Sequence, residues 1–346
     1  MKHQTTRYGE VPFYKIGTFG NTADAFISKK LFLEYKTKYS FPKKGDILIS
    51  ASGTIGRAVI YDGKPAYFQD SNIVWIDNDE TLVKNDFLFY AYSNVKWNTE
   101  HTTILRLYND NFRNTLIPLP PLNEQNAIAN ILSGLDRYLY ALDALILKKE
   151  GVKKALSFEL LSQRKRLKGF NQAWQRVRLG DIANYLTSNL SVEQITQQGE
   201  IKVYDVNNFI GYTDTTFISD KPYISIVKDG SVGRVRILPP KTNILSTMGA
   251  LIANHKTTTE FLFYLLSNFD FKNFTSGSII PHIYFKDYKE KTIFLPPLNE
   301  QSAIANILSA LDNEITSLKN KKRQFENIKK ALNHDLMSTK IRVLEK

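Results

Sequence analysis

The sequence predicts an α+β protein in which two mixed β-rich modules are separated by two long helices that form an antiparallel coiled coil, with a pseudo-twofold internal repeat. Three observations support this prediction. A block of 18 residues occurs twice, apolar residues follow each block at heptad spacing, and the segments between the blocks are rich in β-branched and aromatic residues. The length of 346 residues allows two or three domains.

The repeated block reads L-P-P-L-N-E-Q-x-A-I-A-N-I-L-S-x-L-D and spans residues 119–136 and 295–312. The copies agree at 16 of 18 positions, and the alignment continues at an offset of 176 with 24 identities over 44 positions. This period is too long for a solenoid and indicates a duplicated domain, used symmetrically or present only as a tandem copy. The chain divides into two variable modules and two constant helical segments: 1–118, 119–168, 169–294 and 295–346.

The constant segments have the features of long helices. A double proline precedes each one, and Glu124 and Glu300 place negative charge at the positive end of the helix dipole. About 40 residues of helix span about 60 Å. Apolar residues at alternating steps of four and three form the a/d seam of a coiled coil: Ile128, Leu132, Leu135, Leu139, Leu142 and Ile146, then Ile304, Leu308, Leu311, Ile315 and Leu318. We expect each helix to pack against the other copy; the simpler alternative is packing on its own module.

The variable segments are predicted to be α+β modules built around a repeated turn. Gly53-Thr54-Ile55-Gly56-Arg57 joins two strand-like runs in the first module, and Gly230-Ser231-Val232-Gly233-Arg234 does so in the second, at an offset of 177. Glycine adopts the positive φ angles that tight hairpin turns require. We expect a short helix near residues 84–93 and another near 259–267.

The sequence lacks the signatures of common catalytic sites. Without cysteine the chain cannot form disulfides, thiolate-ligated zinc sites or a thiol nucleophile. It has no phosphate-binding glycine loop, no G-x-S-x-G elbow and no N-P-P-aromatic tetrad, and its five histidines are scattered. Glu200-Ile201-Lys202 matches half of a nuclease signature but lies in a strand-like run. No apolar run approaches the ~20 residues of a membrane helix. We therefore expect a cytoplasmic protein that is not an enzyme and binds no metal.

These features together resemble the DNA-specificity (S) subunit of type I restriction–modification enzymes. The resemblance rests on the two repeated blocks, the G-D-I-L-I-S strand with its G-T-I-G-R turn at residues 45–57, the W-Q-R-V-R-L-G-D-I run at 174–182 and the G-S-I-I-P-H run at 277–282. It implies that each module is a target-recognition domain that reads one half of a bipartite, asymmetric site in double-stranded DNA. It also implies that the helices set the spacing between the half-sites and dock two methyltransferase (M) subunits, through which restriction (R) subunits join.

In this family S-adenosylmethionine, ATP and magnesium belong to the partner subunits, so the resemblance implies that this chain binds no cofactor. The chain departs from the family pattern at one place. The W-Q-R-V-R-L-G-D-I run precedes the second module, whereas the first module has no counterpart ahead of Gly9-Glu10. Either the start is truncated or the element is supplied elsewhere.

Reading of bases requires donors and acceptors on exposed loops, and phosphate contacts require Arg or Lys. Arg106 and His282 correspond to each other in the repeat, at the offset of 176. Tyr108 and Tyr284 follow them by two residues, and we expect both tyrosines to belong to the core. The candidates in the first module are Lys43, Lys44, Ser52, Thr54, Arg57, Gln69, Asn72, His101, Thr102, Thr103 and Arg106. Those in the second module are Ser231, Arg234, Arg236, Ser276, Ser278, His282 and Lys286.

The net charge of +12 does not point to these loops. Residues 148–168 and 319–346 each carry +6, so the rest of the chain sums to zero. The charge therefore lies on the later halves of the constant helices, where it suits the helix dipole and can face solvent, an acidic partner or phosphates. A second function stays open, that of a coiled-coil assembly protein whose β-rich modules bind proteins rather than DNA.

Overall fold

The computed structural model describes residues 4–68, 72–97 and 106–344. The chain folds as two compact units. Unit 1 comprises residues 1–143 and 320–346, and unit 2 comprises residues 144–319. Each unit therefore contains one variable module, the beginning of one long helix and the end of the other.

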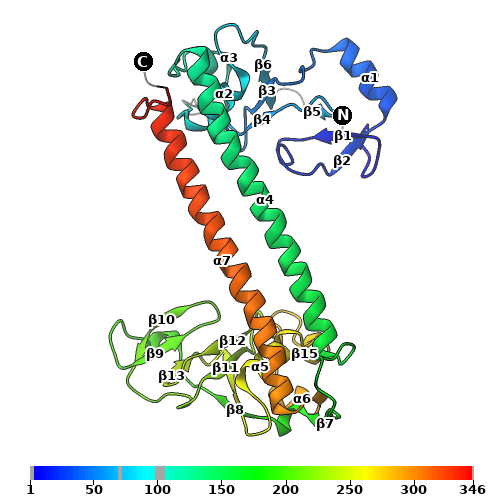
Figure 1. Ribbon diagram of the computed structural model, residues 1–346, viewed down its shortest axis with the longest axis vertical. Helices are drawn as coiled ribbons and strands as arrows, with labels where there is room; N and C mark the ends of the chain where they lie inside the picture. The colour runs from blue at the N-terminus through cyan, green and yellow to red at the C-terminus, as the bar shows by residue number, and fades with distance from the viewer. Residues whose placement is uncertain (1–3, 69–71, 98–105, 345–346) are drawn as a thin grey trace. The chain divides into compact units, whose positions relative to one another are not determined.

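The long helices are α4 (Leu122–Leu161) and α7 (Leu298–Met337), each of 40 residues (Figure 1). Both begin directly after the double proline that the sequence places before them. Both are followed at matching positions by a residue with a positive φ angle, 63° at Gln163 and 59° at Thr339. A left-handed residue is a common end of a helix, so the repeat extends to the way in which each helix stops. The predicted fold class with two long helices is confirmed.

In unit 2 the end of α4 runs antiparallel to the beginning of α7. The ammonium of Lys149 lies 2.7 Å from the carboxylate of Glu314, and that of Lys153 lies 2.5 Å from Asp312. The residue number rises along α4 while it falls along α7, which is the antiparallel arrangement expected for the coiled coil.

Unit 1 contains the corresponding pairing of the beginning of α4 with the end of α7. Lys322 lies 2.7 Å from Asp143, and Lys329 pairs with Asp136. The second of these pairs is the repeat counterpart of the second pair in unit 2. In both units basic residues from the later half of one helix therefore meet acidic residues from the earlier half of the other, and this accounts for part of the charge concentrated there.

The predicted seam is largely buried. Its buried members are Ile128, Leu132, Leu142, Ile146, Ile304, Leu308 and Ile315. Leu135, Leu139, Leu311 and Leu318 are partly exposed. A module helix completes the packing, because in unit 1 Ile128 and Leu132 share a cluster with Phe87 and Tyr90 of α2 (Asn85–Asn94) and with Leu336 of α7. Packing on the other copy and packing on the module therefore occur together.

The first module consists of two small sheets with short helices. One sheet is antiparallel, with strand order β4-β3-β6, and the other has the order β2-β1-β5. Its strands are β1 (Val11–Tyr14), β2 (Ala25–Ile27), β3 (Ile47–Ser50), β4 (Ala58–Ile60), β5 (Tyr67–Phe68) and β6 (Ile73–Ile76). Its further helices are α1 (Lys29–Lys38) and α3 (Asn109–Arg113). The expected helix near residues 84–93 is present as α2, one residue later.

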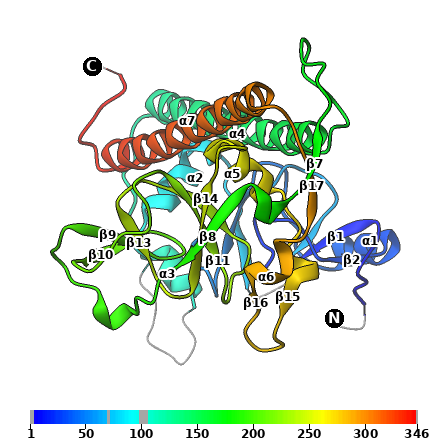
Figure 2. The same ribbon diagram turned by 90° about the horizontal axis from the view of Figure 1, so that it is seen from below.

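The second module has a larger sheet of order β12-β11-β14-β8 and a separate sheet of order β10-β9-β13, which stands to one side of it (Figure 2). Two strand pairs, β15-β16 and β17-β7, complete it. The strands are β7 (Gln175–Arg178), β8 (Ala183–Thr187), β9 (Ile201–Tyr204), β10 (Phe209–Thr213), β11 (Tyr223–Val227), β12 (Val235–Leu238), β13 (Thr242–Ile244), β14 (Met248–Ala253), β15 (Thr275–Ser276), β16 (His282–Ile283) and β17 (Thr292–Leu295). The helices are α5 (Thr259–Ser267), α6 (Phe285–Tyr288) and the 3₁₀ turns η1 (Leu179–Asp181), η2 (Val192–Gln194) and η3 (Lys272–Phe274).

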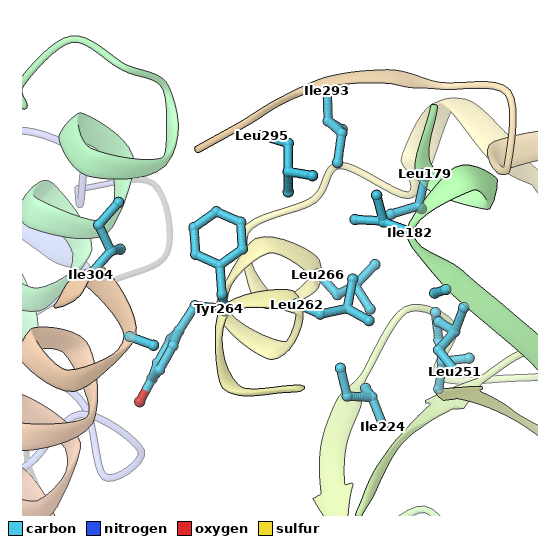
Figure 3. Close-up of a cluster of buried hydrophobic side chains, with 14 of the residues drawn as sticks. Leu179, Ile182, Ile224, Leu251, Leu262, Tyr264, Leu266, Ile293, Leu295 and Ile304 are labelled. Atoms are coloured by element: carbon cyan, nitrogen blue, oxygen red, sulfur yellow. The ribbon is translucent and has the colours of Figure 1, made fainter. Parts of the chain in front are cut away.

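Helix α5 connects the second module to α7. Figure 3 shows Leu262 and Leu266 pointing from α5 toward the sheet residues Ile224 and Leu251, whereas Tyr264 lies on the side that faces α7. Apolar side chains at this spacing put both faces of one short helix into the core. The bounds of α5 agree with the helix that the sequence predicts at 259–267.

Candidate nucleic-acid interface

The repeated glycine turns have the same geometry in both modules. The φ angles are 67° at Gly53 and 79° at Gly56, and 83° at Gly230 and 80° at Gly233. In each turn the second glycine donates its N–H to the carbonyl of the last residue of the preceding strand at 2.9 Å. The predicted hairpin turns, which join β3 to β4 and β11 to β12, are therefore confirmed.

A later segment of each module pairs with its turn. Arg106 forms an antiparallel bridge with Ser52, and His282 forms the equivalent bridge with Asp229. The residue after each of them donates its N–H to a carbonyl at the start of the turn, at 2.8 and 2.9 Å. The expectation that Arg106 and His282 occupy equivalent places is confirmed, and both lie beside the turn.

The prediction that Tyr108 and Tyr284 belong to the core is wrong. They are 46% and 48% exposed. Each lies two residues after Arg106 or His282, with one buried residue between, so strand-like alternation directs both members of the pair outward. The guanidinium of Arg106 lies 5.8 Å from the ring centre of Tyr108. In the second module His282 stacks on Tyr284 at 6.4 Å, and the ammonium of Lys286 lies 5.4 Å from the same ring. The sequence signal was this polar–apolar–aromatic alternation.

The polar groups at the turn differ between the modules. In the first, the hydroxyl of Ser52 donates to the side-chain oxygen of Asn72 at 2.9 Å. In the second, Nδ1 of His282 lies 2.7 Å from a carboxylate oxygen of Asp229. The same backbone frame therefore presents an amide and a hydroxyl in one module and an imidazole and a carboxylate in the other.

The two arginines predicted around the second turn bind a neighbouring turn of the same module. Arg234 donates to the side-chain oxygen of Asn207 at 3.2 Å. Arg236 donates to the carbonyls of Asn207 and Asp205 at 2.6 and 3.1 Å, and it stacks over Tyr204. They fix the β9–β10 turn against β12, and their contact with DNA stays a prediction.

The loop between β15 and β16 combines predicted and unpredicted residues. Ser276 and Ser278 are exposed, as a reading loop requires. Sequence reasoning missed Ile279 and Ile280, which are 92% and 55% exposed at the tip. Exposed isoleucines on a hairpin tip are the kind of apolar group that contacts a thymine methyl group or wedges between bases.

The other predicted residues of the first module, besides Ser52, Asn72 and Arg106, fall into three groups. Thr54 and Lys44 are exposed, and Lys43 is an exposed partner of Asp77 at 3.1 Å. Arg57 donates to the carbonyl of Phe19 at 2.9 Å and so holds a loop of its own module. The remaining candidates, Gln69, His101, Thr102 and Thr103, lie outside the described residues.

The glutamine of the repeated block attaches each module helix to a long helix. Gln125 accepts a hydrogen bond from the N–H of Lys84 at 2.8 Å, and Gln301 accepts one from the N–H of Thr258 at 3.0 Å. Lys84 and Thr258 are the N-cap residues of α2 and α5. Each glutamine also donates its amide to two backbone carbonyls. One buried side chain thus satisfies groups at the starts of two helices.

The glutamate of the repeated block binds an arginine that follows the other long helix. Arg342 donates two hydrogen bonds to Glu124, at 2.7 and 2.6 Å, and Arg166 donates two to Glu300, at 3.2 and 2.6 Å. The hydrogen bonds from Arg342 hold the pKa of Glu124 below its ordinary value. In unit 2 the indole of Trp174 donates a further hydrogen bond to Glu300 at 3.0 Å.

The aspartate that ends the block joins three elements. Asp136 accepts a hydrogen bond from the hydroxyl of Tyr90 in α2 at 2.7 Å, and Asp312 accepts one from Tyr264 in α5 at 2.9 Å. Burial, reinforced by the carboxylate, raises the pKa of both tyrosines, so each hydroxyl stays protonated and donates. Each aspartate also pairs with a lysine of the other long helix. The polar residues of the block therefore fix the helix-to-module and helix-to-helix contacts.

Over the described ranges, no group of three or more His, Asp or Glu residues is placed to hold a metal ion. Within the same ranges, no helix is both long and apolar enough to cross a membrane. What the chain presents is a pair of exposed loop clusters on a repeated frame.

Comparison with known proteins identifies the family to which this chain is similar. The family model described as the type I restriction modification DNA specificity domain matches twice, over residues 1–149 and 171–327. A type I restriction enzyme specificity subunit of Haemophilus influenzae is 64% identical over 133 residues, which cover 38% of this chain and 34% of that protein. The MjaX specificity subunit of Methanocaldococcus jannaschii is 28% identical over 337 residues, covering 86% and 79%.

Solved structures share the fold. The S subunit of a type I restriction-modification system from M. genitalium matches with a TM-score of 0.65 and 20% identity, covering 97% of this chain and 91% of that one. A chain from a study of complex assembly in the type I R-M system matches with a TM-score of 0.56 and 18% identity, covering 87% and 82%. With two family-model matches that span most of its length, the chain belongs to the type I restriction–modification DNA specificity family.

Proposed function

We propose that this chain is the non-catalytic subunit that reads the DNA sequence for a type I restriction–modification complex. Each module reads one half of a bipartite, asymmetric site. The observation that carries the proposal is the glycine turn together with the later segment that pairs with it. This arrangement occurs once per module, with the same backbone hydrogen bonds but with different outward side chains. A constant frame with different side chains is what two readers of different half-sites need.

The outward groups suit this role chemically. Arg106 with Tyr108, and His282 with Tyr284, combine hydrogen-bond donors with exposed aromatic faces. Arginine donates bidentately to guanine in the major groove, and the serine and threonine hydroxyls of the same loops can bond to bases or phosphates. The modules carry net charges of only +3 (residues 1–118) and +2 (residues 169–294), so binding of DNA by the isolated chain is weak and depends on partner subunits.

The long helices set the half-site spacing and dock two methyltransferase subunits, through which restriction subunits join. Support comes from large apolar side chains that α4 leaves exposed, such as Tyr140 at 79% and Leu147 at 69%. S-adenosylmethionine, ATP and magnesium are then bound by the partners. Co-purification with the methyltransferase subunit should fall at least tenfold for Leu147→Asp and stay unchanged for Leu33→Asp, a residue of α1 that is 52% exposed.

The test of DNA reading is a module exchange in the assembled methyltransferase. Residues 1–118 are replaced by the first module of another family member, and methylated sites are mapped across a genome. One half of the recognised sequence should change while the other half and the spacing stay constant; exchange of residues 169–294 should change only the other half. A change in both halves contradicts the proposal. If the chain instead retains proteins but no DNA in a pull-down, and this retention does not change with salt concentration, the protein-binding alternative would be favoured.

A further inference from the structure

The side chains of Asp229 and His282 form a pair at the glycine turn of the second module. Nδ1 of His282 lies 2.7 Å from a carboxylate oxygen of Asp229, and the two side chains are 35% and 29% exposed. The backbone already fastens the later segment to the turn without this pair, because the N–H of Ile283 donates to the carbonyl of Lys228 at 2.9 Å. The pair is therefore an addition to a frame that has its own hydrogen bonds.

The first module shows that the frame forms with other side chains. Ser52 stands at the place of Asp229 in the turn. Arg106 stands at the place of His282 and forms the same backbone bridge to the turn. The N–H of Leu107, the next residue, donates to a carbonyl of that turn at 2.8 Å. Since neither an imidazole nor a carboxylate is needed to build the frame, the pair in the second module has a different role.

The pair fixes the position of the imidazole proton. A carboxylate only accepts hydrogen bonds, so Nδ1 of His282 carries the proton and donates to Asp229. In a neutral imidazole the other ring nitrogen, Nε2, is then an acceptor. Asp229 thereby holds the ring in one orientation and leaves at Nε2 a single polar atom of defined character.

The Nε2 edge of the ring is uncovered. Within the described ranges, no hydrogen bond reaches Nε2 of His282. Gly277, where φ is 90°, lies beside this edge, and a Cβ there would lie 3.1 Å from Cδ2, the carbon next to Nε2. The ring of Tyr284 lies nearly parallel to the imidazole, at 17° between the planes and 6.4 Å between the centres. Glycine on one side and a flat ring on another thus leave the edge accessible.

We propose that His282 reads one base of the second half-site through Nε2, and that Asp229 is the positioning residue that fixes the tautomer and orientation of its ring. An accepting Nε2 matches the amino group of adenine or cytosine in the major groove and meets only acceptors on guanine or on the oxygen of thymine. The inference rests on the proposed function and deepens it, because it assigns base discrimination to one ring atom and its control to a carboxylate behind the ring.

Two substitutions of His282 separate reading from fastening. Asparagine retains a polar atom near the place of Nδ1, whereas glutamine retains one near the place of Nε2. The probe is a duplex that carries the site mapped for the parent methyltransferase, titrated with the assembled complex. His282→Gln should bind it within about threefold of the parent, and His282→Asn about tenfold more weakly, since one base contact is lost. The reverse order, with asparagine tolerated and glutamine not, would show a fastening role and overturn the inference.

Asp229→Asn tests the positioning role. An amide can accept from Nδ1 or donate to it, so the substitution admits the second tautomer, in which Nε2 is a donor. Duplexes with single base changes should show discrimination falling about tenfold at one position of the second half-site. His282→Gln should relax the same position, because its amide also donates or accepts. The first half-site should be unaffected. His255→Asn is the matched control, an exposed histidine between β14 and α5 of the same module, and should change nothing.

The outcomes against the inference are specific. It is overturned if no position relaxes, if binding falls evenly over all positions, or if Asp229→Asn and His282→Gln relax different positions. An equal effect of His255→Asn overturns it too. Failure of the proposed function is a separate result, because exchange of residues 169–294 would then leave the second half of the methylated sequence unchanged. If that exchange changes the second half while these variants keep every position, only the assignment to His282 and Asp229 fails.

Discussion

Replacing Gln301 with alanine tests whether the repeated glutamine holds a module on its long helix. Gln301 is fully buried and takes part in four hydrogen bonds of 2.8–3.0 Å, two as a donor to carbonyls and two as an acceptor from the Thr257 hydroxyl and the Thr258 N–H. At about 0.5–1.5 kcal/mol for each hydrogen bond, the loss of four costs about 2–6 kcal/mol. A central value of about 4 kcal/mol is a large fraction of the stability of a domain.

The repeat provides a matched second site. Gln125 takes part in three such hydrogen bonds, because Val83 stands where Thr257 supplies a hydroxyl. Gln125→Ala should therefore cost about 3 kcal/mol, about one hydrogen bond less than Gln301→Ala. Ser302→Ala is the control. It changes the neighbouring exposed residue and should stay within about 0.5 kcal/mol.

The assay is hydrogen exchange followed by mass spectrometry, which reports the free energy of local opening. In Gln301→Ala, amides of residues 258–266 should exchange several hundredfold faster, since about 1.4 kcal/mol corresponds to a factor of ten. In Gln125→Ala the acceleration should appear at residues 84–93. An acceleration below about threefold, or one spread evenly over the whole chain, would refute the attachment role.

Three further predictions concern other parts of the structure. Gly233→Ala should destabilise unit 2 by about 1–3 kcal/mol in urea unfolding, because φ is 80° and the added methyl would lie 2.7 Å from the ring of Phe271. The pKa of Glu124 is lowered by Arg342, so the pair stabilises unit 1 fully above the ordinary value of 4.5. That stabilisation should disappear as the pH falls through the depressed pKa, and Glu124→Gln should remove this acid dependence from thermal unfolding curves. In the assembled methyltransferase, Tyr284→Ala should weaken DNA binding about 10–100-fold if the ring stacks on a base, while Tyr284→Phe should bind within threefold of the parent; equal loss in both would contradict stacking.

Much of the architecture can be predicted from the sequence, because the repeat shows the same helix and turn signals twice. The double prolines and heptad steps predict helices whose observed bounds are Leu122–Leu161 and Leu298–Met337. The paired glycines predict hairpin turns, since few other residues adopt the required φ angles. These are local signals, in which residues within about a turn of one another determine the outcome.

The site was less predictable because its contacts are long-range. Arg166 and Glu300 are 134 residues apart, and no periodicity announces their pairing. The charge of Arg236 predicts a DNA contact, which stays a prediction, but no pattern announces that its guanidinium donates to backbone carbonyls of a distant turn. The aromatic character of Tyr284 favours the core, whereas alternation around the buried Ile283 directs it outward. Tertiary partners, which the sequence does not reveal, decide the contacts of Arg166 and Arg236.

The division of the long helices between the units has a consequence for the order of folding during synthesis. Unit 2 is one continuous stretch, residues 144–319, so its whole sequence is synthesised before residues 320–346. Unit 1 combines residues 1–143, which precede unit 2, with residues 320–346, which follow it. Its Glu124–Arg342 contact closes a loop of 218 residues and can form only after all of unit 2 has been made. Until then the apolar surface around Ile128 lacks Leu336, so unit 1 is begun before unit 2 but completed after it.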